Sequence, residues 1–91
     1  MAETLSDDEI TEGLPEHWER DGDEIVRTYE FDSYLAGVGF AAGAGGVAQD
    51  AFHHPELTIG YEEVEVRLTS HEAGGITEQD LDLAARFDDL L

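Results

Sequence analysis

Cysteine and lysine are absent from this chain of 91 residues, and arginine occurs only four times. Without cysteine the protein can form neither a disulfide framework nor a thiolate nucleophile. With no lysine and four scattered arginines, it also lacks the clustered positive charge that binds the phosphates of nucleic acids. The sequence therefore predicts no nucleic-acid partner and no cysteine chemistry.

Negative charge dominates instead, because 23 acidic residues give a formal net charge of −19. At molar salt the Debye length falls to about 3 Å, so the repulsion across such a surface is largely screened. The carboxylates are spread along the whole chain without EF-hand spacing, which argues against a calcium-binding tail. We interpret the composition as that of a protein from a high-salt cytoplasm, folded because 41% of its residues are hydrophobic.

Long apolar runs are also missing. The longest uncharged stretch, residues 33–49, is short and rich in glycine, and the first residues lack the basic and apolar segments of a signal peptide. We expect a single domain over residues 1–91, located in the cytoplasm and without membrane contact. A chain this short has a modest core, and association into a homo-oligomer would bury more surface.

Capping and turn residues divide the first part of the chain. Ser6-Asp7-Asp8-Glu9 fits a capping box and predicts a short helix. Asp21-Gly22 favours a tight turn between two strand-like segments, residues 17–20 and 24–31. His17 begins the first of these segments without an apparent partner, so we expect it to be a surface residue.

A longer helix is predicted for residues 34–52, capped by Asp32 or Ser33. Two apolar sets recur along it at helical spacing: Leu35, Val38 and Ala42, then Ala44, Ala48 and Phe52. The helix also contains five glycines, each of which costs about 1 kcal/mol relative to alanine. We attribute them to close packing, since the lysine of a phosphate-binding loop is absent.

Period-two alternation marks two strands after this helix. The residues that share one face are Leu57, Ile59 and Tyr61 in the first strand and Val64, Val66, Leu68 and Ser70 in the second. The strands are expected to turn near Glu62-Glu63, and Thr77 is expected to cap a last helix. The order α-β-β-α-β-β-α predicts an α+β fold, in which a four-stranded antiparallel sheet has its helices packed on one face.

Three of the four histidines fall where these elements end. His53 and His54 follow the glycine-rich helix, His71 follows the last strand, and Asp80 lies in the first turn of the last helix. Taken alone, Asp80 is explained as a helix cap, because a carboxylate is favourable in a first turn. Functional side chains are nevertheless often presented where elements end, so all four residues are candidates for a site.

The spacing of these residues resembles a known signature. Five residues separate His53-His54-Pro55 from Tyr61, nine separate Tyr61 from His71, and eight separate His71 from Asp80. Together with Gly74-Gly75-Ile76-Thr77, this pattern resembles the pterin-4a-carbinolamine dehydratase family over essentially the whole chain.

The resemblance implies a dehydratase that needs neither a metal ion nor a cofactor. Its substrate would be a small-molecule pterin, 4a-hydroxytetrahydropterin, which loses water to give quinonoid dihydropterin in the recycling of a pterin cofactor. His53, His54 and His71 would be the active-site histidines, with Asp80 as their acidic companion. The resemblance also implies a homo-oligomer, either a dimer or a tetramer.

The chemistry suits these side chains on independent grounds. Loss of the hydroxyl needs one proton delivered to the leaving group and another removed from a ring nitrogen, and imidazole, with a pKa of about 6.5, can do either. We assign His53 and His71 to acid–base work, His54 to holding the pterin and Asp80 to orienting an imidazole or binding. Which histidine is the acid and which is the base stays open.

Four positions near the candidate residues depart from the family pattern. Gln49 and Phe52 stand where the family often has an acidic residue and an Asp or Asn. Gln79 stands where an arginine is common, and Leu57 where a tryptophan is common. The departures affect the surroundings of the histidines, which are themselves kept.

Two other functions fit the same residues. Three histidines and a carboxylate are a plausible ligand set for a metal ion, although adjacent histidines rarely point at one ion and the usual zinc spacing is absent. The second alternative is a non-catalytic interaction module that retains the fold.

Overall fold

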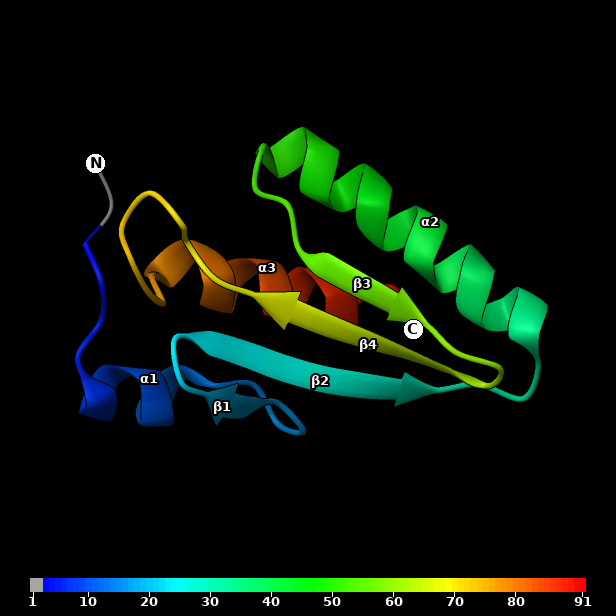
Figure 1. Cartoon of the computed structure of the whole chain (residues 1–91), viewed down its shortest axis with the longest axis horizontal. Helices are drawn as coiled ribbons and strands as arrows, with labels where there is room; N and C mark the ends of the chain where they lie inside the picture. The colour runs from blue at the N-terminus through cyan, green and yellow to red at the C-terminus, as the bar shows by residue number, and fades with distance from the viewer. Residues whose placement is uncertain (1–2) are drawn as a thin grey trace.

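The computed structural model describes residues 3–91, which form three helices and one four-stranded antiparallel sheet (Figure 1). In chain order the elements are α1 (Asp7–Gly13), β1 (Glu19–Asp21), β2 (Glu24–Glu30), α2 (Tyr34–Ala51), β3 (Glu56–Ile59), β4 (Glu63–Leu68) and α3 (Glu78–Asp88). The strands lie in the order β1-β2-β4-β3, so the two central strands come from different hairpins. This arrangement confirms the predicted α+β fold and its order of elements.

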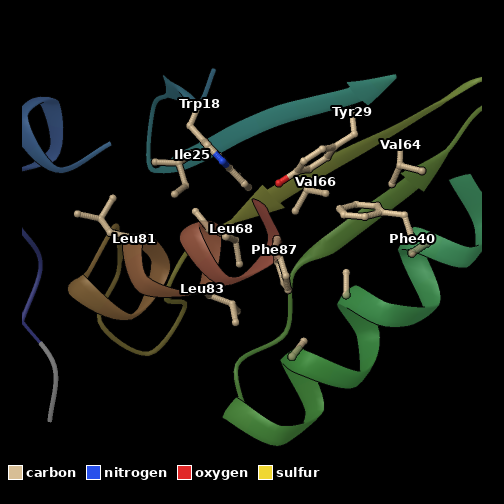
Figure 2. Packing of buried hydrophobic residues seen from close by; sticks show 14 of the residues in the cluster. Trp18, Ile25, Tyr29, Phe40, Val64, Val66, Leu68, Leu81, Leu83 and Phe87 are labelled. Atoms are coloured by element: carbon tan, nitrogen blue, oxygen red, sulfur yellow. The ribbon is translucent and has the colours of Figure 1, made fainter. Parts of the chain in front are cut away.

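The core lies between one face of the sheet and the helices. Alternate residues of the central strands, Ile25 and Tyr29 in β2 and Val64, Val66 and Leu68 in β4, are buried on that face. Figure 2 shows these side chains gathered with Phe40 of α2 and with Leu81, Leu83 and Phe87 of α3. The alternation in β4 thus confirms its predicted inner face. Among residues 3–91, no helix has the length and apolar character to cross a membrane.

The first hairpin is shorter than predicted. Residues Gly22 and Asp23 form its turn, because Asp21 pairs with Glu24, and Gly22 has the positive φ of 63° that glycine adopts readily. The expected turn at Asp21-Gly22 was therefore one residue too early. His17 lies outside β1, with its side chain 67% exposed as expected of a surface residue.

Helix α2 begins at the predicted Ser33 cap, and the two apolar sets at helical spacing are only partly buried. Its buried residues are Gly37, Phe40, Ala41, Ala44 and Ala48. Leu35 is 75% exposed and Phe52 is 81% exposed, so neither set lies wholly against the core. Alanine and glycine occur on every side of this helix, so hydrophobicity alone could not fix its rotation.

Close packing explains only part of the glycine content of α2. A Cβ atom on Gly37 would lie 3.3 Å from the side chain of Val64, so the helix approaches the sheet closely there. Gly39, Gly45 and Gly46 have no neighbouring atom within 4 Å of such a Cβ. Packing within the chain therefore explains Gly37 but not these other three.

The second hairpin also ends earlier than predicted. Strand β3 stops at Ile59, and the amide of Gly60 donates to the carbonyl of Glu63 at 2.7 Å, which closes the turn. Tyr61 lies in this turn and is 79% exposed, so it does not share a strand face with Leu57. The turn comprises residues 60–62, and Glu63 already belongs to β4.

Candidate active site

The junction between α2 and β3 presents two of the candidate histidines. Phe52 ends α2 in a left-handed conformation, with φ 53° and ψ 41°, and the amide of His53 donates back to Ala48 at 3.1 Å. Pro55 follows, and a proline biases the residue before it toward extended backbone. His53 and His54 therefore leave the helix on a short extended segment that leads into β3.

The loop after β4 presents the third candidate. Ser70 pairs with Gly75 in an isolated antiparallel bridge, and the residues between them turn back on themselves. Gly74 takes a φ of 82° in this turn, a left-handed conformation that glycine adopts without a steric penalty. His71 is thereby exposed directly beside the buried Ser70.

His53 and Asp80 form a close imidazole–carboxylate pair. The Nε2 atom of His53 lies 2.6 Å from Oδ1 of Asp80. The Asp80 side chain is fully buried, and that of His53 is 14% exposed. A buried carboxylate is stable only when its oxygens have donors, and this imidazole serves one of them.

The second oxygen of Asp80 is held by two other donors. The Ser70 hydroxyl donates to Oδ2 at 2.8 Å, and the backbone N–H of Thr77 donates to the same atom at 2.9 Å. The Thr77 hydroxyl lies 2.8 Å from the Ser70 hydroxyl, so a chain of hydrogen bonds reaches Asp80. Asp80 is thus both the expected cap of α3 and a partner of His53, because its two oxygens perform different tasks.

A pocket of about 550 Å³ opens over these residues. Its lining residues are Ala51, Phe52, His53, His54, Thr69, Ser70, His71, Glu72, Ala73 and Gln79. All three candidate histidines therefore face one cavity, whose volume suits a small organic ligand. Asp80 is outside this lining and reaches the cavity through His53, and neither Tyr61 nor His17 lines it.

His54 is fixed differently from His53. Its Nε2 atom lies 3.0 Å from the side-chain oxygen of Gln49, in the last turn of α2. The Phe52 ring stands edge-on to the His54 ring, with the ring centroids 5.7 Å apart. Gln49 and Phe52, two positions that depart from the family pattern, are thus the direct neighbours of His54.

Ser70 and Thr77 are the site residues that sequence reasoning missed. Ser70 was expected only as the last inward residue of a strand, and Thr77 only as a helix cap. Ser70 is 6% exposed and Thr77 is 0% exposed. This burial separates the two residues from ordinary surface hydroxyls. A serine that continues a run of buried valine and leucine was the available signal, because a buried hydroxyl requires a polar partner.

The geometry does not support the metal alternative. Among residues 3–91, no three His, Asp or Glu side chains come together in a way that could hold a metal ion. The pocket instead offers imidazoles, one of them paired to a carboxylate, which are acid–base groups. Fold and pocket together define a small α+β protein with a histidine-lined cavity at one end of its sheet.

Comparison with known proteins identifies the family. The family described as "Pterin 4 alpha carbinolamine dehydratase" matches residues 3–90, and the chain belongs to it. A protein of Natronomonas pharaonis named "Putative pterin-4-alpha-carbinolamine dehydratase" is 69% identical over 99% of this chain and 98% of its own length. A protein of the same name from Haloarcula marismortui is 62% identical over 96% of this chain and 95% of its own.

A solved structure supports the same assignment. The "transcriptional coactivator/pterin dehydratase" of Brucella melitensis superposes with a TM-score of 0.89 and 29% identity, covering 96% of this chain and 97% of that one. The resemblance inferred from the histidine spacing is therefore confirmed at the level of family and fold. The halophilic relatives agree with the acidic composition.

Proposed function

We propose that this protein dehydrates 4a-hydroxytetrahydropterin to quinonoid dihydropterin, as a hydro-lyase in pterin recycling. The observation that carries the proposal is the His53–Asp80 pair at 2.6 Å, in which the imidazole lines the same cavity as His54 and His71. The pocket volume of about 550 Å³ accommodates a bicyclic ring with a short substituent. Family membership supports the same chemistry.

The reaction needs two proton transfers and no change of oxidation state. The bond between C4a and the hydroxyl oxygen breaks, a proton joins the leaving oxygen to form water, and a ring nitrogen gives up a proton. We assign these transfers to His53 and His71, since imidazole exchanges protons near neutral pH. His54, held by Gln49, contacts the pterin ring instead.

Asp80 acts through His53 and does not touch the substrate. Because Nε2 of His53 faces the carboxylate, Nδ1 is the ring nitrogen left to exchange a proton with the pterin. The hydrogen bond between the Asp80 carboxylate and Nε2 holds the His53 ring in one orientation. Ser70 and Thr77 keep the carboxylate from turning away.

A non-catalytic interaction module is the second candidate function. The Brucella relative carries "transcriptional coactivator" beside "pterin dehydratase" in its description, so proteins of this fold are named for both kinds of role. A homo-oligomer, dimer or tetramer, and a cytoplasmic location stay predictions. Light scattering in molar KCl tests the predicted oligomeric state.

The deciding experiment is stopped-flow dehydration of a 4a-carbinolamine in molar KCl. We expect the wild type to exceed the uncatalysed rate, and His53→Ala and His71→Ala each to lose about 10²–10⁴-fold in kcat. His17→Asn is the matched control, because it removes an exposed histidine at a positive φ that asparagine tolerates. A wild-type rate equal to the uncatalysed background overturns the proposal and leaves the interaction module.

A further inference from the structure

Phe52 combines two features that packing does not explain. Its backbone is left-handed, with a φ of 53°, which is uncommon for a bulky side chain and is usually left to glycine or asparagine at the end of a helix. Its ring is 81% exposed, so burial does not compensate for the strained backbone. A large apolar side chain thus stands in water, in a conformation that glycine would adopt more readily.

The surroundings of Phe52 suggest what the ring is for. It lines the cavity together with the three histidines, and it stands edge-on to His54 at a 75° angle between the ring planes. His54 in turn is held by Gln49 at 3.0 Å. The Phe52 and His54 rings therefore pack edge-on against each other at the cavity, and the His54 ring is fixed to α2 through Gln49.

We propose that Phe52 binds the substrate by packing its ring against the planar bicyclic ring of the pterin. The inference rests on the proposed function, because it takes the pterin as the occupant of the cavity. Aromatic side chains bind flat heterocycles through their faces and edges, and such contacts are strong for nucleic-acid bases, which resemble a pterin in size and shape. Phe52 is a binding residue in this account and exchanges no proton.

Phe52→Gly separates this role from a structural one, because the two roles predict different results. Glycine relieves the left-handed strain, so the variant should melt at a higher temperature than the wild type. The loss of the ring should weaken binding, with KM raised about tenfold and kcat changed less than about twofold. Phe52→Tyr keeps the ring and should retain the wild-type KM.

Binding is measured independently of activity by calorimetric titration of 7,8-dihydropterin into each protein in molar KCl. We expect the Kd of Phe52→Gly to rise about tenfold over wild type, that of Phe52→Tyr to stay within about twofold, and the mass by light scattering to stay the same. A Kd of Phe52→Gly within about twofold of wild type overturns the inference, whatever its mass. An inactive wild type that still binds through Phe52 would refute the proposed function alone, whereas a wild type that binds no pterin refutes both.

Discussion

His53 and Asp80 stand 27 residues apart in the sequence, yet the imidazole Nε2 and the carboxylate Oδ1 lie 2.6 Å from each other. The contact joins the end of α2 to the first turn of α3. Asp80 would be needed for the helix cap in any case, since its other oxygen accepts the Thr77 N–H. One buried carboxylate therefore stabilises the fold and orients the histidine.

Ser70 is expected to matter for both stability and rate. Ser70→Ala removes a donor from Asp80 and leaves the buried Thr77 hydroxyl without its partner, which should destabilise the protein by about 1–3 kcal/mol. A freer Asp80 holds His53 less firmly, so kcat should fall while KM changes little. Chemical denaturation and steady-state kinetics measure the two effects.

Ser70→Thr is the matched control for this role, because it keeps the hydroxyl and should keep most of kcat. If Ser70→Ala loses stability but retains the wild-type kcat in solutions where it is folded, the hydroxyl supports the fold only, and its positioning role is wrong.

The sequence predicted the parts of the fold that local chemistry determines. Ser6 and Glu9 form the expected capping box, and β4 buries the expected alternate residues. The rotation of α2 was not predictable, because alanine and glycine on all its sides leave contact with the sheet to decide which face is buried. The turn of the first hairpin was misplaced by one residue, since the pairing of β1 with β2 sets the register.

The sequence predicted which residues belong to the candidate site better than it predicted the contacts between them. His53, His54 and His71 do line one cavity, and their positions at element ends were the signal. The pairing of His53 with Asp80 spans two elements, and no local pattern encodes a contact of that kind. The role of Ser70 was missed although it continues the inner face of its strand, because no local pattern shows which polar partner its buried hydroxyl meets.

Because Tyr29 is buried, we expect the protein to lose stability at high pH. The pKa of Tyr29 is raised far above its usual value near 10. The main cause is burial, and the second is a hydrogen bond to the Asp88 carboxylate. A raised pKa means that the folded state binds a proton that the unfolded state releases. The resulting stability is fully present below about pH 10 and is lost as the pH rises beyond it.

Phenolate absorbance measures this effect in the double variant Tyr34→Phe, Tyr61→Phe, which leaves Tyr29 as the sole tyrosine. We expect the phenolate to appear together with the loss of the circular dichroism of the fold. Ionisation near pH 10 in a protein that stays folded would show that burial does not protect this group.

Like charges on the sheet predict a dependence of stability on salt. Glu30 of β2 faces Glu63 of β4 directly, and both are exposed. Repulsion between them is strong in dilute buffer and screened in molar salt. Glu30→Gln should raise Tm by about 1–4 °C in dilute KCl and by less in molar KCl.

Glu3→Gln removes the same charge near the start of the chain and serves as the control for the cross-strand pair. The wild type itself should melt at a higher temperature in molar KCl than in dilute buffer, because its net charge is −19. A wild-type Tm that does not change with salt would contradict this view of the acidic surface.

A double-mutant cycle on His53 and Asp80 tests the central claim most directly. Asp80→Asn retains an acceptor oxygen for Ser70 and Thr77, so the cap of α3 can persist while the charge beside His53 is lost. The cycle compares kcat/KM of the wild type, His53→Ala, Asp80→Asn and the double variant for 4a-carbinolamine dehydration in molar KCl.

If the two residues act as one unit, the double variant should be about as slow as the slower single variant. Losses that multiply, as independent contributions would, contradict the account. A wild type no faster than the uncatalysed reaction would contradict it as well.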